Sequence, residues 1–222
     1  IYNTMDGGRS RQWVSVGDYD KDGYQDLIVT GLDDYMDPDG KVDENGVPIV
    51  HHDRRVVYLY KNNKGKGFIR QETPLDGVKP FLGLSRGSVH FGDMDNDGWL
   101  DIVSSGYGPG EGNLHVYWNN GDGTFSENEQ YLYGANDSSC SLCDLDTDGY
   151  MDIVVTGYSR NKGSGAKSFY VYRNCGNRNF EMLNDLFCGF EGVDGATPSF
   201  GDVNHDGLPD ILVGGHGEQH AI

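Results

Sequence analysis

The chain has 222 residues, which suits one mid-sized domain or one array of repeats. Its 34 glycines and 12% aromatic residues are typical of short strands joined by turns. The formal net charge of −18 argues against a nucleic acid or an anionic membrane as partner, and no apolar run reaches transmembrane length.

Taken in chain order, the predicted elements repeat as strand, acidic turn, strand, strand, turn, strand. The first strand alternates larger apolar with small residues over 13–17, 88–92, 139–143 and 197–201. The second strand is expected over 27–31, 102–106, 153–157 and 211–215, and the third over 56–61, 114–118 and 169–173. The fourth strand opens on Phe68, Phe125 and Phe180. Four antiparallel strands in a repeat of roughly 50–60 residues predict the blades of an all-β propeller.

The turn between the first two strands is an acidic phrase, D-x-[DN]-x-D-G-x-x-D, which occurs at 18–26, 93–101, 144–152 and 202–210. Carboxylates at positions 1, 3 and 5 point to one side when the backbone curls tightly, and glycine at position 6 permits the positive φ of that curl. Ca²⁺ takes about six to eight oxygen ligands, whereas Mg²⁺ prefers fewer protein ligands. The phrase therefore predicts about four Ca²⁺ sites.

The expected ligands are the side chains at positions 1, 3, 5 and 9 and the backbone carbonyl at position 7. In chain order they are Asp18, Asp20, Asp22, Tyr24 and Asp26; Asp93, Asp95, Asp97, Trp99 and Asp101; Asp144, Asp146, Asp148, Tyr150 and Asp152; and Asp202, Asn204, Asp206, Leu208 and Asp210. The phrase is not an EF-hand, which needs a glutamate at position 12 and flanking helices. The alternative is that the phrase is only a turn rich in Asp and Gly. Without a cation, however, four crowded carboxylates in such a turn would repel one another.

The fourth loop differs from the others in its charge. Asn204 supplies an oxygen but no charge, so three carboxylates remain where the other loops have four. Affinity at oxygen-ligand sites follows ligand charge. We therefore expect the fourth loop to bind a cation most weakly.

The connections at the opposite end of the blades are the candidate ligand-binding face, because variable loops on a rigid scaffold usually carry binding. The largest connection is an acidic insertion at 32–54 that includes His51 and His52. We expect a solvated hairpin there, with a further cation or a ligand contact as the alternative. Arg11 and Arg86 stand at equivalent positions and either bind an anion or link blades. A catalytic His90 is conceivable, but a lone histidine is usually structural.

The four cysteines all fall in the third repeat and show no zinc-binding spacing. They are Cys140, Cys143, Cys175 and Cys188. We interpret them as small core residues, and their number is compatible with one disulfide.

Three motifs together resemble the FG-GAP/VCBS repeat family, whose best-known relative is the integrin α-subunit head. They are Phe-Gly-Asp before the acidic turn, Asp-Ile-Val after it, and Asn-Asn-Gly-Asp-Gly-Thr-Phe at 119–125. The resemblance spans nearly the whole chain and implies a Ca²⁺-stabilised β-propeller, usually of about seven blades, on a secreted or cell-surface protein. Departures are Cys143 in place of glycine, Asn204 in place of aspartate and Pro209 before Asp210, and the last two concern the fourth site.

The repeat boundaries place the blades at 8–77, 84–134 and 135–190, with an incomplete blade at 194–222, in a single propeller region. Residues 1–7 resemble the end of a fourth strand. We therefore expect an excerpt of a larger propeller, and a closed four-bladed ring is the alternative. In an excerpt, the strand at 208–215 would expose an unpaired edge.

The predicted function is a calcium-binding extracellular or cell-surface propeller for adhesion or recognition, which binds a protein or carbohydrate through the face opposite the calcium loops. The alternatives are a polysaccharide lyase or similar carbohydrate-active enzyme, and a structural spacer. A lyase needs basic and tyrosine side chains clustered in one groove. Tyr107, His51, His52 and Arg86 are dispersed candidates. No nucleophile elbow, phosphate loop or triad pattern is present, so the sequence indicates no catalytic residue.

Overall fold

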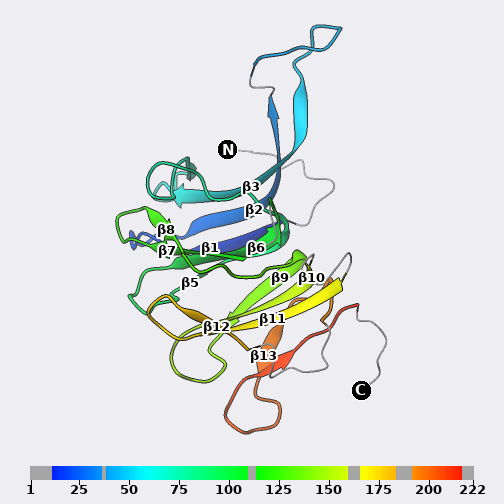
Figure 1. Cartoon of the computed structure of the whole chain (residues 1–222). Coiled ribbons are helices and arrows are strands. Elements are labelled where there is room, and N and C mark those ends of the chain that lie inside the picture. Colours follow the sequence, from blue (N-terminus) through cyan, green and yellow to red (C-terminus); the bar gives the residue numbers. More distant parts are fainter. Residues whose placement is uncertain (1–11, 37–38, 110–113, 160–165, 184–191, 217–222) are drawn as a thin grey trace.

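The structure is a computed structural model that describes residues 12–36, 39–109, 114–159, 166–183 and 192–216. Within these ranges it consists of strands and turns, and none of its elements is a helix that could cross a membrane. The strands form antiparallel sheets that follow one another along the chain (Figure 1). The prediction of an all-β fold is confirmed.

Each of the first three sheets has four strands, and the strands lie side by side in chain order, as in a propeller blade. The first contains β1 (Trp13–Gly17), β2 (Asp26–Met36), β3 (Val50–Asn62) and β4 (Phe68–Gln71). The second contains β5 (Ser85–Gly92), β6 (Asp101–Tyr107), β7 (Leu114–Asn119) and β8 (Phe125–Glu127). The third contains β9 (Asn136–Cys143), β10 (Asp152–Ser159), β11 (Ala166–Asn174) and β12 (Phe180–Met182). The described part of the fourth contains β13 (Ser199–Gly201) paired with β14 (Asp210–Leu212).

The hydrophobic core lies between successive sheets rather than within one of them. The third and fourth strands of each following sheet contribute an aromatic pair to this layer. Tyr117 and Phe125 lie between the first and second sheets, and Tyr172 and Phe180 lie between the second and third. All four rings are buried, at 2% exposure or less. The sheets are therefore held together by side chains that recur at the same place in each repeat.

The innermost strands approach one another closely because small residues line them. The Ser15 hydroxyl accepts a hydrogen bond from the Phe91 backbone N–H (3.2 Å), and the Ser88 hydroxyl accepts one from Cys140 (2.7 Å). A Cβ on Gly17 would lie only 2.6 Å from Leu100 Cδ1 of the next sheet. Gly17 thus lies in close contact with the neighbouring blade.

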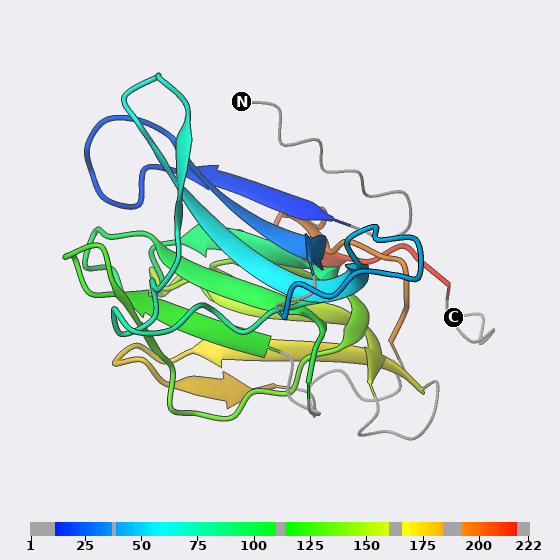
Figure 2. The same ribbon diagram turned by 90° about the horizontal axis from the view of Figure 1, so that it is seen from above.

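The insertion at 32–54 extends β2 and β3 into a long antiparallel hairpin with pairs from Leu27–Tyr60 to Met36–Val50. Its tip is closed by a bridge between Val42 and Pro48 and is exposed to solvent. Figure 1 shows the hairpin projecting beyond the stacked sheets. Figure 2 shows its tip and the acidic turn between β1 and β2 at opposite ends of the first sheet.

The cysteines differ from the expectation of small core residues. Cys140 is buried, but Cys143 is half-buried and Cys175 is exposed in the turn after β11, and all three carry free thiols. The core interpretation is therefore wrong for Cys175, because this turn projects into solvent. Cys188 and the strand-like residues 1–7 lie outside the described residues.

Phe125 and Phe68 open the fourth strand of successive sheets, yet Phe125 is 0% and Phe68 41% exposed. Phe125→Ala removes a ring from a filled core and is expected to lower the free energy of unfolding by roughly 3–5 kcal/mol. Phe68→Ala, the matched control, should lower it by less than about 1 kcal/mol because its ring already contacts water. Urea unfolding measures both, and equal losses would contradict this account of the core.

Candidate metal centre

The four acidic turns adopt one backbone conformation. The residue at position 4 is left-handed in each, with φ of 56° at Lys21, 59° at Asn96, 59° at Thr147 and 63° at His205. The glycine at position 6 follows with φ between 85° and 94°. The sequence pattern predicted the glycine at position 6 but not the left-handed conformation at position 4. A residue other than glycine adopts this conformation only at some steric cost.

The first aspartate closes each curl by accepting backbone hydrogen bonds. In the first loop the N–H groups of Asp22 and Gly23 donate to the two oxygens of Asp18, at 3.0 and 2.9 Å. Asp144 and Asp202 accept the equivalent pairs in the third and fourth loops. These hydrogen bonds fix the first carboxylate inside the curl of the turn.

Three of the loops bring three carboxylates together, with one oxygen of each lying within 4.8 Å of the others. The clusters are Asp18, Asp20 and Asp22; Asp93, Asp95 and Asp101; and Asp144, Asp146 and Asp152. A donor set made only of carboxylate oxygens suits a hard cation such as Ca²⁺. These three loops therefore gather oxygen donors of the kind that such a cation binds, and the ligand roles expected for the residues of all four loops stay predictions.

The aspartate at position 9 also anchors its loop to the third strand. The backbone N–H groups of Asn119 and Met94 each donate to one oxygen of the fully buried Asp101, both at 2.8 Å. Asp26 and Asp152 are held in the same way. Because each carboxylate oxygen has two lone pairs, this role leaves capacity for a cation.

The charges in these loops are incompletely balanced by the protein. Burial, and to a smaller extent the charges of Asp95 and Asp97, raise the pKa of Asp101 to about 7 although two backbone N–H groups oppose the rise. Burial likewise raises the pKa of Asp152 to about 6. Among the described residues, one buried oxygen of Asp93 and one of Asp95 accept no hydrogen bond. A bound cation would supply the missing positive charge, so the residues present fit it.

Basic side chains, which the sequence pattern did not reveal, reach all three clusters. Lys61 contacts Asp20 and lies 3.5 Å from Asp22. Arg173 pairs with Asp146 at 2.6 Å, and Arg178 pairs with Asp95 at 2.9 Å. The only sequence signal was that Lys61 and Arg173 each precede the asparagine of the turn after the third strand.

That asparagine is a second feature that the sequence pattern left unassigned. The Asn119 side chain donates to Leu100 O of its own loop (3.0 Å) and to Tyr19 O of the preceding loop (2.9 Å). Asn174 repeats both contacts one blade later, with Met151 and Met94. Each asparagine therefore ties its own acidic loop to that of the neighbouring blade.

The fourth loop keeps the backbone but not the carboxylate cluster. The Asn204 Nδ2 group donates to Asp206 Oδ2 at 3.0 Å and lies 3.4 Å from Asp210 Oδ1, so an N–H points where the other loops present an oxygen. Within the described residues no acidic triplet forms there. This geometry favours the prediction that the fourth loop binds a cation most weakly.

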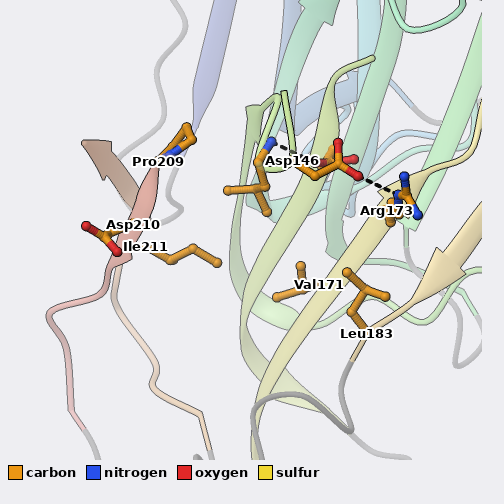
Figure 3. Close-up of a pocket in the computed structure, with 9 residues that line it drawn as sticks. Asp146, Val171, Arg173, Leu183, Pro209, Asp210 and Ile211 are labelled. Atoms are coloured by element: carbon orange, nitrogen blue, oxygen red, sulfur yellow. Dashed lines mark hydrogen bonds and ion pairs between the residues drawn. The ribbon is translucent and has the colours of Figure 1, made fainter. Parts of the chain in front are cut away.

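A cavity of about 390 Å³ separates the third and fourth sheets. Pro209, Asp210 and Ile211 face Val171 and Leu183 across it (Figure 3). Arg173 and Asp146 of the third loop lie at its edge. The third loop therefore borders the space between these two sheets.

The other candidate residues that the structure describes have structural partners of their own. Arg86 forms a two-pronged ion pair with Asp137 of the next blade, at 2.7 Å, which is the structural link between blades. His90 packs against Trp13 with ring centroids 5.4 Å apart, and burial lowers its pKa. Tyr107 lies under the Arg55 guanidinium. Arg11 and the side chains of His51 and His52 lie outside the described part of the chain.

Comparisons with known proteins agree with the repeat pattern. A family model described as an FG-GAP-like repeat matches residues 93–155 and 144–213, which together exceed half of the chain. Human integrin alpha-6 is 28% identical over 166 residues, covering 72% of this chain and 13% of that protein. Mouse integrin alpha-IIb is 30% identical over 173 residues, covering 72% of this chain and 15% of that protein. The chain thus spans only a small part of the length of these relatives.

A solved structure of an Agrocybe aegerita lectin, described as specifically recognising non-reducing terminal N-acetylglucosamine, aligns with 92% of this chain and 46% of that chain. Its sequence identity is 20% and its TM-score is 0.49. A likeness at this level supports no conclusion about function.

Asn119→Ala removes the bond that joins two neighbouring loops and leaves the Tyr19 and Leu100 carbonyls without that donor. We expect it to lower the free energy of unfolding by roughly 1–3 kcal/mol in the presence of a chelator. Asn62→Ala is the matched control, because within the described residues the Asn62 side chain donates to Gln25 O of its own loop and to no neighbouring blade. Its effect should be less than half as large. Denaturant unfolding of both variants checks this, and indistinguishable losses would show that the cross-blade bond contributes nothing.

Proposed function

Because the chain belongs to the FG-GAP-like repeat family, we propose that it is a calcium-stabilised β-propeller that recognises a protein or carbohydrate at the cell surface or outside the cell. The observation that carries the proposal is that the acidic turn of each of three successive blades gathers a cluster of three carboxylates. The relationship to integrin alpha chains supports adhesion or recognition as the role.

Calcium would act on stability rather than on chemistry. When bound, it neutralises carboxylates that lie within the same turn. Asp101 and Asp152 join the second and third acidic loops to the third strand of their own sheets. Asn119 and Asn174 join the same two loops to the acidic loop of the preceding blade. A cation that holds the carboxylates therefore stiffens the contact between blades as well as the turn. Its binding free energy adds to folding because the site exists only in the native state.

Recognition is assigned to the opposite end of the blades, where the hairpin of β2 and β3 projects. Eleven residues of β2 separate this end from the first acidic loop, roughly 35 Å along an extended strand. At the hairpin base, Arg54 donates to the Tyr58 hydroxyl and that hydroxyl donates to Asp33, both at 2.7 Å. Arg55 lies 4.3 Å above the ring of Tyr107 in the second sheet. These contacts orient the hairpin against its neighbour.

The tip of the hairpin presents apolar side chains to solvent. Val42 is 52% and Val47 56% exposed, among exposed acidic residues such as Asp43. Apolar side chains rimmed by polar ones are a common feature of protein interaction surfaces. The tip therefore favours a protein partner on this face.

Chelation should lower the melting temperature markedly. Each site adds about 2.7 kcal/mol when calcium exceeds its dissociation constant a hundredfold, so removal of calcium from three sites is a large loss. Calorimetry in millimolar calcium and in excess EDTA measures the shift. Magnesium at the same concentration is the control and should restore less, because it accepts fewer protein oxygens. Identical melting in calcium and EDTA would refute structural calcium.

The recognition face can be tested with a variant that changes Val42 and Val47 to serine. A panel of purified extracellular matrix proteins and polysaccharides would be screened for binding to the whole chain. We expect binding to a panel member to be lost in the double variant. Val203→Ser is the matched control, since Val203 is 64% exposed but lies in the fourth acidic loop. Equal loss in the control, or undiminished binding by the double variant, would place recognition elsewhere.

A further inference from the structure

We propose that Lys61 and Arg173 are tethered counter-ions that occupy the carboxylates of the first and third loops and that calcium must displace. Each would lower the calcium affinity of its own loop while stabilising that loop in the calcium-free protein. The inference rests on the proposed calcium binding and adds residues that set the affinity of the individual sites.

The two side chains stand at the same place in different blades. Lys61 is the second-last residue of the third strand of the first sheet, just before Asn62, and Arg173 is the second-last residue of the third strand of the third sheet, just before Asn174. The backbone N–H of each of these asparagines is bonded to the position-9 aspartate of its loop at 2.8 Å. This fixed contact brings the preceding side chain to the edge of the same loop.

Both side chains engage positions 3 and 5 of their loops. Lys61 contacts Asp20 and lies 3.5 Å from Asp22. Arg173 Nε lies 2.6 Å from Asp146, and its Nη2 lies 3.4 Å from Asp148. An ammonium and a guanidinium of different shape thus meet the same pair of expected calcium ligands. This recurrence distinguishes the contacts from chance surface pairs.

The second loop lacks this device in its own blade. Its equivalent residue is Trp118, which carries no charge. Arg178 of the neighbouring blade reaches over the Trp118 ring, 5.0 Å from its centroid, and pairs with Asp95. In the described part of the chain, Arg178 forms an ion pair with position 3 of the second loop but not with position 5. The second loop is therefore neutralised across a blade boundary rather than from its own third strand.

Displacement follows from the chemistry of the groups. Lysine and arginine have only donors and cannot themselves ligate a cation, so they compete with calcium for carboxylate oxygens. The side chains of Lys61 and Arg173 are 39% and 42% exposed, and exposed ion pairs are weak. The tethers should therefore weaken calcium binding only moderately.

The test compares Lys61→Met and Arg173→Met with the unchanged chain in a calcium titration. The amides of Gly23 and Gly149 report on the first and third loops in nitrogen–proton spectra, because they donate to Asp18 and Asp144. We expect Lys61→Met to tighten the first loop by roughly two- to fivefold and leave the third unchanged, the range that an exposed ion pair allows. Arg173→Met should do the reverse.

The matched control is Lys41→Met, which removes the same charge from an exposed pair with Asp39 on the hairpin. It should leave the affinity of both loops unchanged. In excess EDTA, Lys61→Met and Arg173→Met should melt below the unchanged chain although they bind calcium more tightly. Lys61→Gln, which keeps a long polar side chain without charge, should repeat the effect of Lys61→Met.

The outcomes separate this inference from the proposed function. Glycine signals that do not respond to calcium in the unchanged chain would overturn both. Responding signals with equal or weaker binding in Lys61→Met and Arg173→Met would overturn the counter-ions and leave structural calcium in place. Equal tightening by Lys41→Met would show that net charge alone sets affinity and would also overturn the counter-ions.

Discussion

Negative charge gathered into tight, partly buried turns is the constraint on which the rest of this structure depends. Carboxylates within one turn repel one another, and burial penalises their charged form. Backbone N–H groups donate hydrogen bonds to the carboxylates of Asp18 and Asp101. The basic side chains of Lys61 and Arg173 form ion pairs with other carboxylates of the loops. Burial, together with the charges of Asp95 and Asp97, still raises the pKa of Asp101. The proposed calcium completes the balance.

The same turns serve as joints between blades. The Asn119 side chain connects its own loop with the one before it, and Arg178 connects the second loop with the third blade. The aromatic pair of Tyr117 and Phe125 fills the layer between the same sheets. The loops and the packed aromatic layer therefore join the same pairs of neighbouring sheets.

The connections at the two ends of the blades differ in sequence and in length. The acidic turns are short and alike, since one backbone conformation must place several carboxylates. The opposite connections differ in length, and the longest forms the hairpin of β2 and β3, anchored at its base by Arg54, Tyr58 and Arg55. Such a division would leave the proposed recognition end free to vary without changing the acidic turns at the other end.

The sequence by itself determined the all-β architecture, the strand order, the hairpin and the position of the acidic turns, because alternation and turn residues act over a few neighbouring positions. Only the tertiary structure decided which distant groups meet those turns. The anchoring of Asp101 by Met94 and Asn119, the pairing of Lys61 with Asp20, the link from Arg86 to Asp137 and the exposure of Cys175 depend on how separate segments pack. Local sequence patterns predict none of these contacts, because the partners are distant in the sequence and meet only when the strands and sheets pack together.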